Sequence, residues 1–247
     1  MRTVQLILGF EGTHYEGWQS QRKNKTIQEV FERILSKILK GSVTVFGCSR
    51  TDSGVHARQF VAHFKTPAAL PDEKIKDALN YYLPKDVTVF KARTAHESFH
   101  ARFDAKSKLY RYRIWNDRTR PLFERNYTYW HPNPLNILAM RRAAKHLVGR
   151  HDFSAFQAQS GDGRNPVKTL KKVQLRCKKP LIEIDVEGTG FLRHMVRIIA
   201  GTLIEVGRGR MNPDAVKEIL SSKDRKKAGS TAKPQGLILW KVSYKEN

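Results

Sequence analysis

The spacing of hydrophobic residues in the first part of the chain predicts alternating strands and helices. Apolar and polar residues alternate over 3–10, which is the two-residue period of a half-buried strand. Residues 26–39 place apolar side chains three and four apart behind a Thr26–Glu29 capping box, which predicts a helix that ends before Gly41. The other elements predicted here are strands over 43–48, 59–64 and 86–92 and a helix over 71–83.

Strand, helix, strand, strand, helix and strand is the order of a ferredoxin-like unit. The same order recurs after residue 104 with insertions. Its predicted elements are strands over 108–115, 168–177, 181–187 and 236–244, and helices over 133–149, over 191–206 and from Pro213. We therefore predict the α+β class, with two ferredoxin-like (βαββαβ) halves, residues 1–104 and 105–247, and a mixed, largely antiparallel sheet.

The charge of the chain points to a polyanionic partner. The 247 residues contain 46 Lys and Arg against 23 Asp and Glu, a formal net charge of +23. A field of one sign on this scale favours nucleic acid. Most cations in basic runs such as 223–227 only solvate a surface, but together they can contact phosphates. With no signal-peptide core and no apolar run of membrane length, we expect a cytoplasmic protein without a membrane partner, and no protein partner is evident.

One acidic residue stands out against this basic background. The stretch FGCSRTDSGVHARQF, residues 46–60, places Asp52 in a loop with Arg50, His56 and Arg58. Asp52 could simply start a turn, because Ser and Gly follow it. Alternatively, a carboxylate beside an arginine stays ionised and suits a nucleophile or a base.

Other catalytic templates do not match. The chain has no glycine-rich phosphate-binding motif, and Thr51 stands where a nucleophile elbow needs its last glycine. His96 and His100 lie four apart without the ligands that would complete a metal set, and Cys48 and Cys177 are expected to be packed thiols. We therefore expect no metal and no cofactor.

Aromatic residues and arginines alternate in the strand over 108–115. Tyr110 and Tyr112 share one face of it with Ile114. Tyr112 is expected to be a core residue, whereas Tyr110 could pack in the core or stack on a base. Arg197 lies in an apolar helical stretch, where it must either find a buried partner or extend to solvent.

Seven blocks in register along the chain resemble the TruA-type tRNA pseudouridine synthases. RTDSGVHA (50–57) is similar to the signature loop of that family, whose aspartate is the catalytic nucleophile. Ser53 stands where alanine is usual and could add a hydrogen bond. The other blocks are GWQSQ with TIQEVFE (17–32), ALNYYLPKDVTV (78–89), SFHARFDAKSKLYRYRI (98–114), GRHDFSAF (149–156), FLRHMVRIIAGTLIEVGRG (191–209) and GLILWKVSY (236–244).

The resemblance implies a role for five residues. Asp52 would be the nucleophile, and Arg197 would be the buried partner of its carboxylate. Tyr110 would contact the target uridine and Leu237 would pack against its base. Arg50 would position the RNA or fill the place of the flipped-out nucleotide.

The resemblance also implies an activity and an assembly. The reaction would convert uridine to pseudouridine in the tRNA anticodon stem-loop, around positions 38 to 40. The two halves would pack around a central cleft, with the Asp52 loop in the first and Tyr110 and Arg197 in the second. The protein would act as a homodimer.

Two other functions fit part of the sequence. A non-catalytic RNA-binding protein would explain the charge and the aromatic residues, but an acid in a basic surface would weaken its binding of phosphate. An RNA hydrolase could use Asp52 as a base, but the sequence shows no second acid or metal set to support it.

Overall fold

The computed structural model describes residues 1–21, 25–158 and 165–245. Within these ranges the chain forms ten strands and five α-helices, so the predicted α+β class is confirmed. The chain divides into two compact units, Met1–Lys106 with Leu239–Asn247, and Ser107–Ile238. No helix in the described ranges is both long and apolar enough to cross a membrane.

The first unit has the predicted order of elements. Its central strand β1 pairs antiparallel with β3 and with β4, while β2 pairs antiparallel with β3 and β10 lies beside β3. The elements are β1 (Arg2–Phe10), α1 (Ile27–Leu39), β2 (Val45–Gly47), β3 (His56–Thr66), α2 (Asp72–Tyr82) and β4 (Val87–Ala95), together with β10 (Leu237–Ser243) from Leu239 onward.

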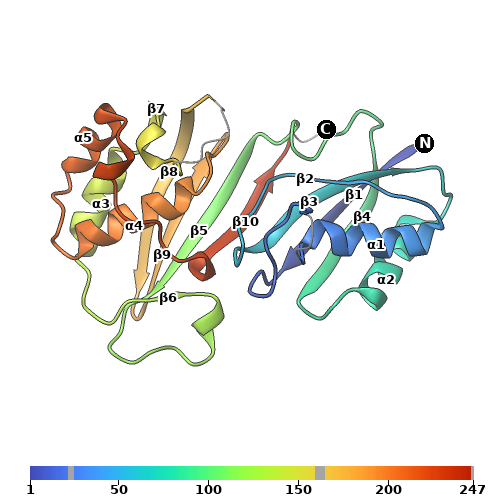
Figure 1. The fold of residues 1–247 in the computed structure, drawn as a ribbon, viewed down its shortest axis with the longest axis horizontal. Helices are drawn as coiled ribbons and strands as arrows, with labels where there is room; N and C mark the ends of the chain where they lie inside the picture. The colour runs from blue at the N-terminus through green and yellow to red at the C-terminus, as the bar shows by residue number, and fades with distance from the viewer. Residues whose placement is uncertain (22–24, 159–164, 246–247) are drawn as a thin grey trace. The chain divides into compact units, whose positions relative to one another are not determined.

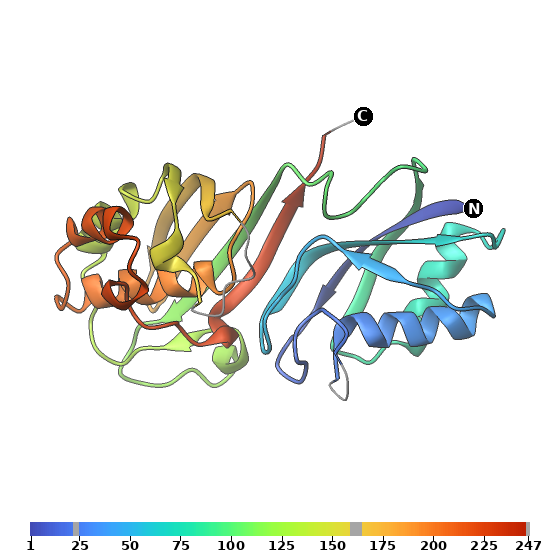
Figure 2. The ribbon, with the colours of Figure 1, turned by 45° about the horizontal axis from the view of Figure 1, so that its top comes forward.

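The core of the first unit lies between this sheet and its two helices. Helices α1 and α2 pack against each other and cover one face of the sheet (Figures 1 and 2). The predicted apolar face of β1 is buried, with Val4, Leu6 and Leu8 at 0% exposure. Side chains at every second strand position and every third or fourth helix position therefore build one apolar layer.

The second unit combines four antiparallel strands with helices. Its strand order is β5-β9-β8-β7, and the short β6 pairs in parallel with β5. Helix α3 contacts β8, α4 contacts β5, and the two helices contact each other. The elements are β5 (Ser107–Trp115), β6 (Tyr129–Trp130), α3 (Ile137–Lys145), β7 (Gly149–Asp152), β8 (Val167–Lys178), β9 (Leu181–Gly188), α4 (Met195–Gly207) and α5 (Ala215–Ser222).

The two faces of β5 differ as the sequence pattern predicts. Tyr110 and Tyr112 are buried, with 6% and 0% exposure. On the opposite face of the sheet, Asp185 of β9 is also buried. Arg111 Nε and Arg176 Nη2 each lie 2.7 Å from one of its carboxylate oxygens. Two guanidinium groups thus compensate the desolvation of one carboxylate.

Two predicted helix boundaries in this unit are wrong. Helix α4 begins at Met195 and not at Phe191, because His194 adopts a left-handed conformation with φ 60° and interrupts the helical path. Helix α3 begins at Ile137, where the Asn136 side chain accepts a hydrogen bond from the Ala139 N–H at 3.0 Å. Helix α3 ends at Lys145, before Gly149. Gly149 has a φ of +117° and is the first residue of strand β7, which the sequence did not predict.

The buried Tyr112 hydroxyl provides a test of this packing. It donates to the Lys233 carbonyl at 2.9 Å, and burial raises the pKa of Tyr112, so the proton stays on the donor. We expect Tyr112→Phe to lower the free energy of unfolding by about 1 kcal/mol, because the carbonyl loses its donor. Denaturant unfolding measures this, with Tyr81→Phe, 81% exposed, as the control that should not change. Equal stability of Tyr112→Phe and the wild type would contradict the assignment.

Candidate active site

Asp52 lies half-buried in the loop that joins β2 to β3. The loop contains a turn in which the Val55 N–H donates to the Asp52 carbonyl at 3.2 Å. Gly54 adopts a φ of +75°, which favours glycine. The predicted turn is therefore present, and Asp52 is its first residue.

A second segment, residues 11–18, holds the Asp52 loop through its backbone. The Gly54 N–H donates to the Tyr15 carbonyl at 3.2 Å, and the Trp18 N–H donates to the Thr51 carbonyl at 3.3 Å. The Ser53 hydroxyl also donates to the Tyr15 carbonyl, at 3.4 Å, which is the additional hydrogen bond expected for serine at this position. The residues on both sides of Asp52 are thus tied to the same segment.

Segment 11–18 and the Asp52 loop approach each other so closely that only glycine fits at two positions. A Cβ atom on Gly12 would lie 2.0 Å from the Val55 carbonyl oxygen, and one on Gly17 would lie 2.2 Å from the Thr51 carbonyl oxygen. Gly17 also has a φ of +87°, where side chains are strained. Direct backbone contact therefore fixes the loop of Asp52 more tightly than side-chain packing could.

Two aromatic residues anchor the supporting segment in the first unit. The Trp18 ring stacks on Phe60 with 4.1 Å between centroids and lies beside Phe31 of α1. The Tyr15 hydroxyl donates to Asp86 Oδ1 at 2.7 Å. Since Trp18 and Tyr15 are only 3% and 2% exposed, these two side chains are part of the core.

The three basic residues near Asp52 in sequence have different environments. His56 is 2% exposed, and its Nδ1 accepts a hydrogen bond from the Gly12 N–H at 3.0 Å, so it supports the backbone. The Arg58 guanidinium lies over the Trp240 ring, 4.4 Å from its centroid. Arg50 is exposed on the same loop as Asp52.

In the second unit, Tyr110 and Leu237 are buried. Tyr110 is 6% exposed, and its ring meets Phe191 edge to face with 5.0 Å between centroids. Leu237 is 5% exposed at the start of β10. A base can contact either residue only if the nucleotide leaves its stack and enters the protein.

Arg197 is half-buried in α4 and forms hydrogen bonds with the segment that precedes β10. Its Nε donates to the Ala232 carbonyl at 2.8 Å, and the Ala232 N–H donates to the Arg197 carbonyl at 3.1 Å. The Arg197 charge also acts on Tyr112, where it opposes the rise in pKa that burial and Tyr129 cause. Of the two alternatives for Arg197, extension to solvent is therefore only partly realised.

Of the two histidines that lacked the ligands for a metal set, His100 packs against other side chains and His96 is exposed. His100 lies 4.7 Å from His63 and 4.2 Å from Phe103 between ring centroids. Burial lowers the pKa of His63 to about 4, so this ring is neutral at physiological pH. Within residues 1–21, 25–158 and 165–245, no group of three His, Cys, Asp or Glu side chains is placed to hold a metal ion.

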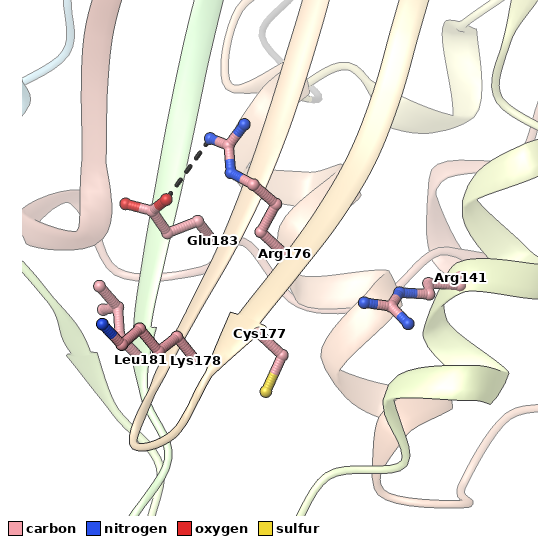
Figure 3. A pocket seen from close by; sticks show the side chains of 6 residues that line it. All are labelled: Arg141, Arg176, Cys177, Lys178, Leu181 and Glu183. Carbon is pink, nitrogen blue, oxygen red and sulfur yellow. Dashed lines mark hydrogen bonds and ion pairs between the residues drawn. The ribbon is translucent and has the colours of Figure 1, made fainter.

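An open depression of about 420 Å³ lies at the end of the β8–β9 hairpin. Figure 3 shows Arg141 reaching toward it from α3, and Arg176 paired with Glu183 at 3.4 Å. Cys177 lines it and is exposed, so the expectation of a packed thiol is wrong here and right for the buried Cys48. Cys177 shares a strand face with the buried Leu175 but lies at the end of β8 near the hairpin turn, and no candidate catalytic residue lines the depression.

Sequence reasoning missed the residues that support the Asp52 loop. No role was predicted for Gly12, Gly17 or Trp18, although Gly17 and Trp18 lie in one of the blocks that resemble the synthases. Two glycines within six residues of a tryptophan, directly after a strand, are the available signal for a close backbone approach.

Comparison with known proteins agrees with the motifs. A sequence model of the family described as tRNA pseudouridine synthase matches residues 7–104 and 143–245. The chain is 45% identical over 244 residues to the tRNA pseudouridine synthase A of Thermoanaerobacter sp. strain X514, covering 99% of this chain and 100% of that protein. It is 43% identical to the tRNA pseudouridine synthase A 2 of Clostridium perfringens strain 13, covering 99% and 100%.

The chain belongs to the tRNA pseudouridine synthase family. The enzyme class predicted from the motifs, an isomerase that acts on tRNA, is confirmed at the level of this family.

Replacing Gly17 tests its close contact with the Thr51 carbonyl, next to Asp52. Gly17→Ala must strain a positive φ and displace the Thr51 carbonyl, so we expect a loss of about 2–4 kcal/mol in unfolding free energy and faster hydrogen exchange of residues 48–55. Gly209→Ala is the matched control, because Gly209 has a φ of +73° with nothing within 4 Å of the added Cβ. It should lose only about 1–2 kcal/mol. Equal losses in the two variants would show that the Gly17 contact is not tight.

Proposed function

We propose that this protein converts uridine to pseudouridine in tRNA, with Asp52 as the nucleophile. The N1–C1′ glycosidic bond breaks, the uracil turns while bound, and C5 forms the new bond to C1′. The proton on C5 leaves to water and N1 takes up a proton, so the product has the same composition as the substrate. The reaction requires no oxidant, reductant or energy-carrying nucleotide.

The fixed loop of Asp52 is the observation that carries the proposal. A solvated aspartate on a turn would have no need for two chain segments in backbone contact. A catalytic carboxylate does, because a small displacement of the reacting atoms costs much of the rate. The loop is also the part of the chain that is most similar to the family's signature.

Three chemical routes fit an ionised carboxylate at this position. Asp52 can attack C1′ of the ribose, add to C6 of the uracil, or remove a proton from the ribose. Each route requires the nucleotide to leave its stack. All three depend on the same oxygen atoms, so the proposal rests on Asp52 and not on the choice between the routes.

The remaining site residues have complementary roles in the proposal. Arg197 provides the positive charge that pairs with the carboxylate. Tyr110 and Leu237 contact the uracil ring, which suits their burial. Arg50 contacts the RNA from its exposed position beside Asp52. We further propose that no metal and no other cofactor takes part.

The proposed substrate is a uridine in the anticodon stem-loop, around positions 38 to 40 of tRNA. The excess of 23 positive charges supports recognition of shape and phosphates more than of base sequence. Pseudouridine mapping in tRNA from cells that lack the gene tests the positions. We also propose a cytoplasmic homodimer, and light scattering of the purified protein tests its mass.

Asp52→Asn tests the nucleophile directly. The amide keeps the shape of the side chain but is a poor nucleophile, so we expect tRNA binding within about threefold of the wild type and a rate at least about a thousandfold lower. Release of tritium from tRNA labelled at C5 of uridine measures the rate, because each turnover removes that hydrogen.

Asp77→Asn is the control for loss of a negative charge, since the Asp77 side chain is 64% exposed on α2. It should release tritium at the wild-type rate. Undiminished release by Asp52→Asn would remove the nucleophile assignment. Tight tRNA binding by the wild type without any release would favour the RNA-binding function instead.

A further inference from the structure

A short segment of small residues, 228–232, lies directly on α4 next to Arg197. A Cβ atom on Gly201 of α4 would lie 1.8 Å from the Ser230 carbonyl oxygen. A Cβ atom on Gly229 would lie 2.7 Å from Thr202 Cα. Glycine is therefore required on both sides of this contact, and the segment has no room to shift toward the helix.

Hydrogen bonds fix the register of this contact. The Thr202 hydroxyl donates to the Ile198 carbonyl at 2.8 Å and accepts from the Gly229 N–H at 2.9 Å. Three residues after Gly229, Ala232 makes its two hydrogen bonds with Arg197, of which the bond from Nε orients the side chain. The direction of the Arg197 guanidinium thus depends on the place of residues 228–232.

Arg225 holds the outer side of the same segment. Its Nη1 donates to the carbonyls of Ala228 at 3.3 Å and Gly229 at 3.0 Å. Its Nη2 donates to the Thr231 hydroxyl at 3.3 Å. One planar guanidinium therefore bonds to three residues of the segment, which a flexible ammonium could not reproduce.

Arg225 differs from its neighbours in the basic run 223–227. Lys226 and Lys227 are exposed, and Lys223 lies 3.1 Å from Asp152. Arg225 is half-buried, and burial lowers its pKa. The interpretation of the run as a set of solvated or phosphate-binding charges therefore does not apply to Arg225.

We propose that Arg225 is a positioning residue, which sets the direction of the Arg197 guanidinium by holding residues 228–232 against α4. The inference rests on the proposed role of Arg197 in the reaction. Without Arg225, the carbonyls of Ala228 and Gly229 lose their donors and turn to water. The Ala232 carbonyl then moves with the segment, and Arg197 loses its fixed orientation.

Arg225→Met tests the proposal, because methionine keeps an apolar side chain of similar length without the donors. We expect the single-turnover rate of tritium release at saturating tRNA to fall at least about tenfold, since misplaced groups act poorly. The dissociation constant for tRNA should change less than about threefold, because one charge of many is lost. Arg225→Lys should recover part of the rate, because it restores one donor.

Lys226→Met is the matched control, since it removes a charge from the same turn without touching the segment. Its single-turnover rate should equal that of the wild type. Thermal unfolding of each variant shows that the rate is measured on folded protein. A wild-type rate for Arg225→Met would overturn the inference and leave the proposed function intact.

A double-mutant cycle shows whether Arg225 acts through Arg197. Arg197→Lys keeps the charge but lacks the Nε donor, so we expect it to slow the reaction on its own. In that background Arg225→Met should slow the rate by no more than about twofold, against about tenfold or more in the wild type. Equal effects in both backgrounds would overturn the inference. A wild-type rate for Arg197→Lys would instead refute the role of Arg197 on which the inference rests.

Discussion

The contact between Gly17 and the Thr51 carbonyl is the constraint on which the account of Asp52 depends. Segment 11–18 comes directly from the central strand of the first unit, and its aromatic side chains are buried in the core. Through it, the packing of the unit reaches the backbone on both sides of Asp52. A surface loop would otherwise be among the least stable parts of a fold. Here the backbone that carries the proposed nucleophile is held by contact with a segment anchored in the core.

Arg197 is held in the second unit by the same physical means. Glycines at Gly201 and Gly229 allow two backbones to touch, and hydrogen bonds then set the register. In both units the backbone next to a proposed site residue is in direct contact with a neighbouring segment. Backbone contact leaves little freedom, because it has no rotamers to adjust.

The sequence predicted the elements of the fold well, because burial repeats with a short period. Val4, Leu6 and Leu8 on β1 and Tyr112 on β5 are core residues for that reason. The start of α4 was not predictable, because residues 191–194 have a helical pattern and only the φ of His194 interrupts it. Long-range contacts were also missed. No local sequence pattern indicates that Gly17 contacts Thr51, or that the Arg225 side chain is half-buried while that of Lys226 is exposed.

The direct measurement of the central claim is the single-turnover rate of Asp52→Glu. Glutamate keeps the charge and nucleophilic group of Asp52 but moves the oxygen atoms by one methylene on a backbone that cannot adjust. A fixed loop predicts a rate at least about a hundredfold below the wild type, with tRNA binding unchanged. A rate within about tenfold of the wild type would mean that the loop adapts to the longer side chain. That result would contradict an active site built on the rigid placement of Asp52.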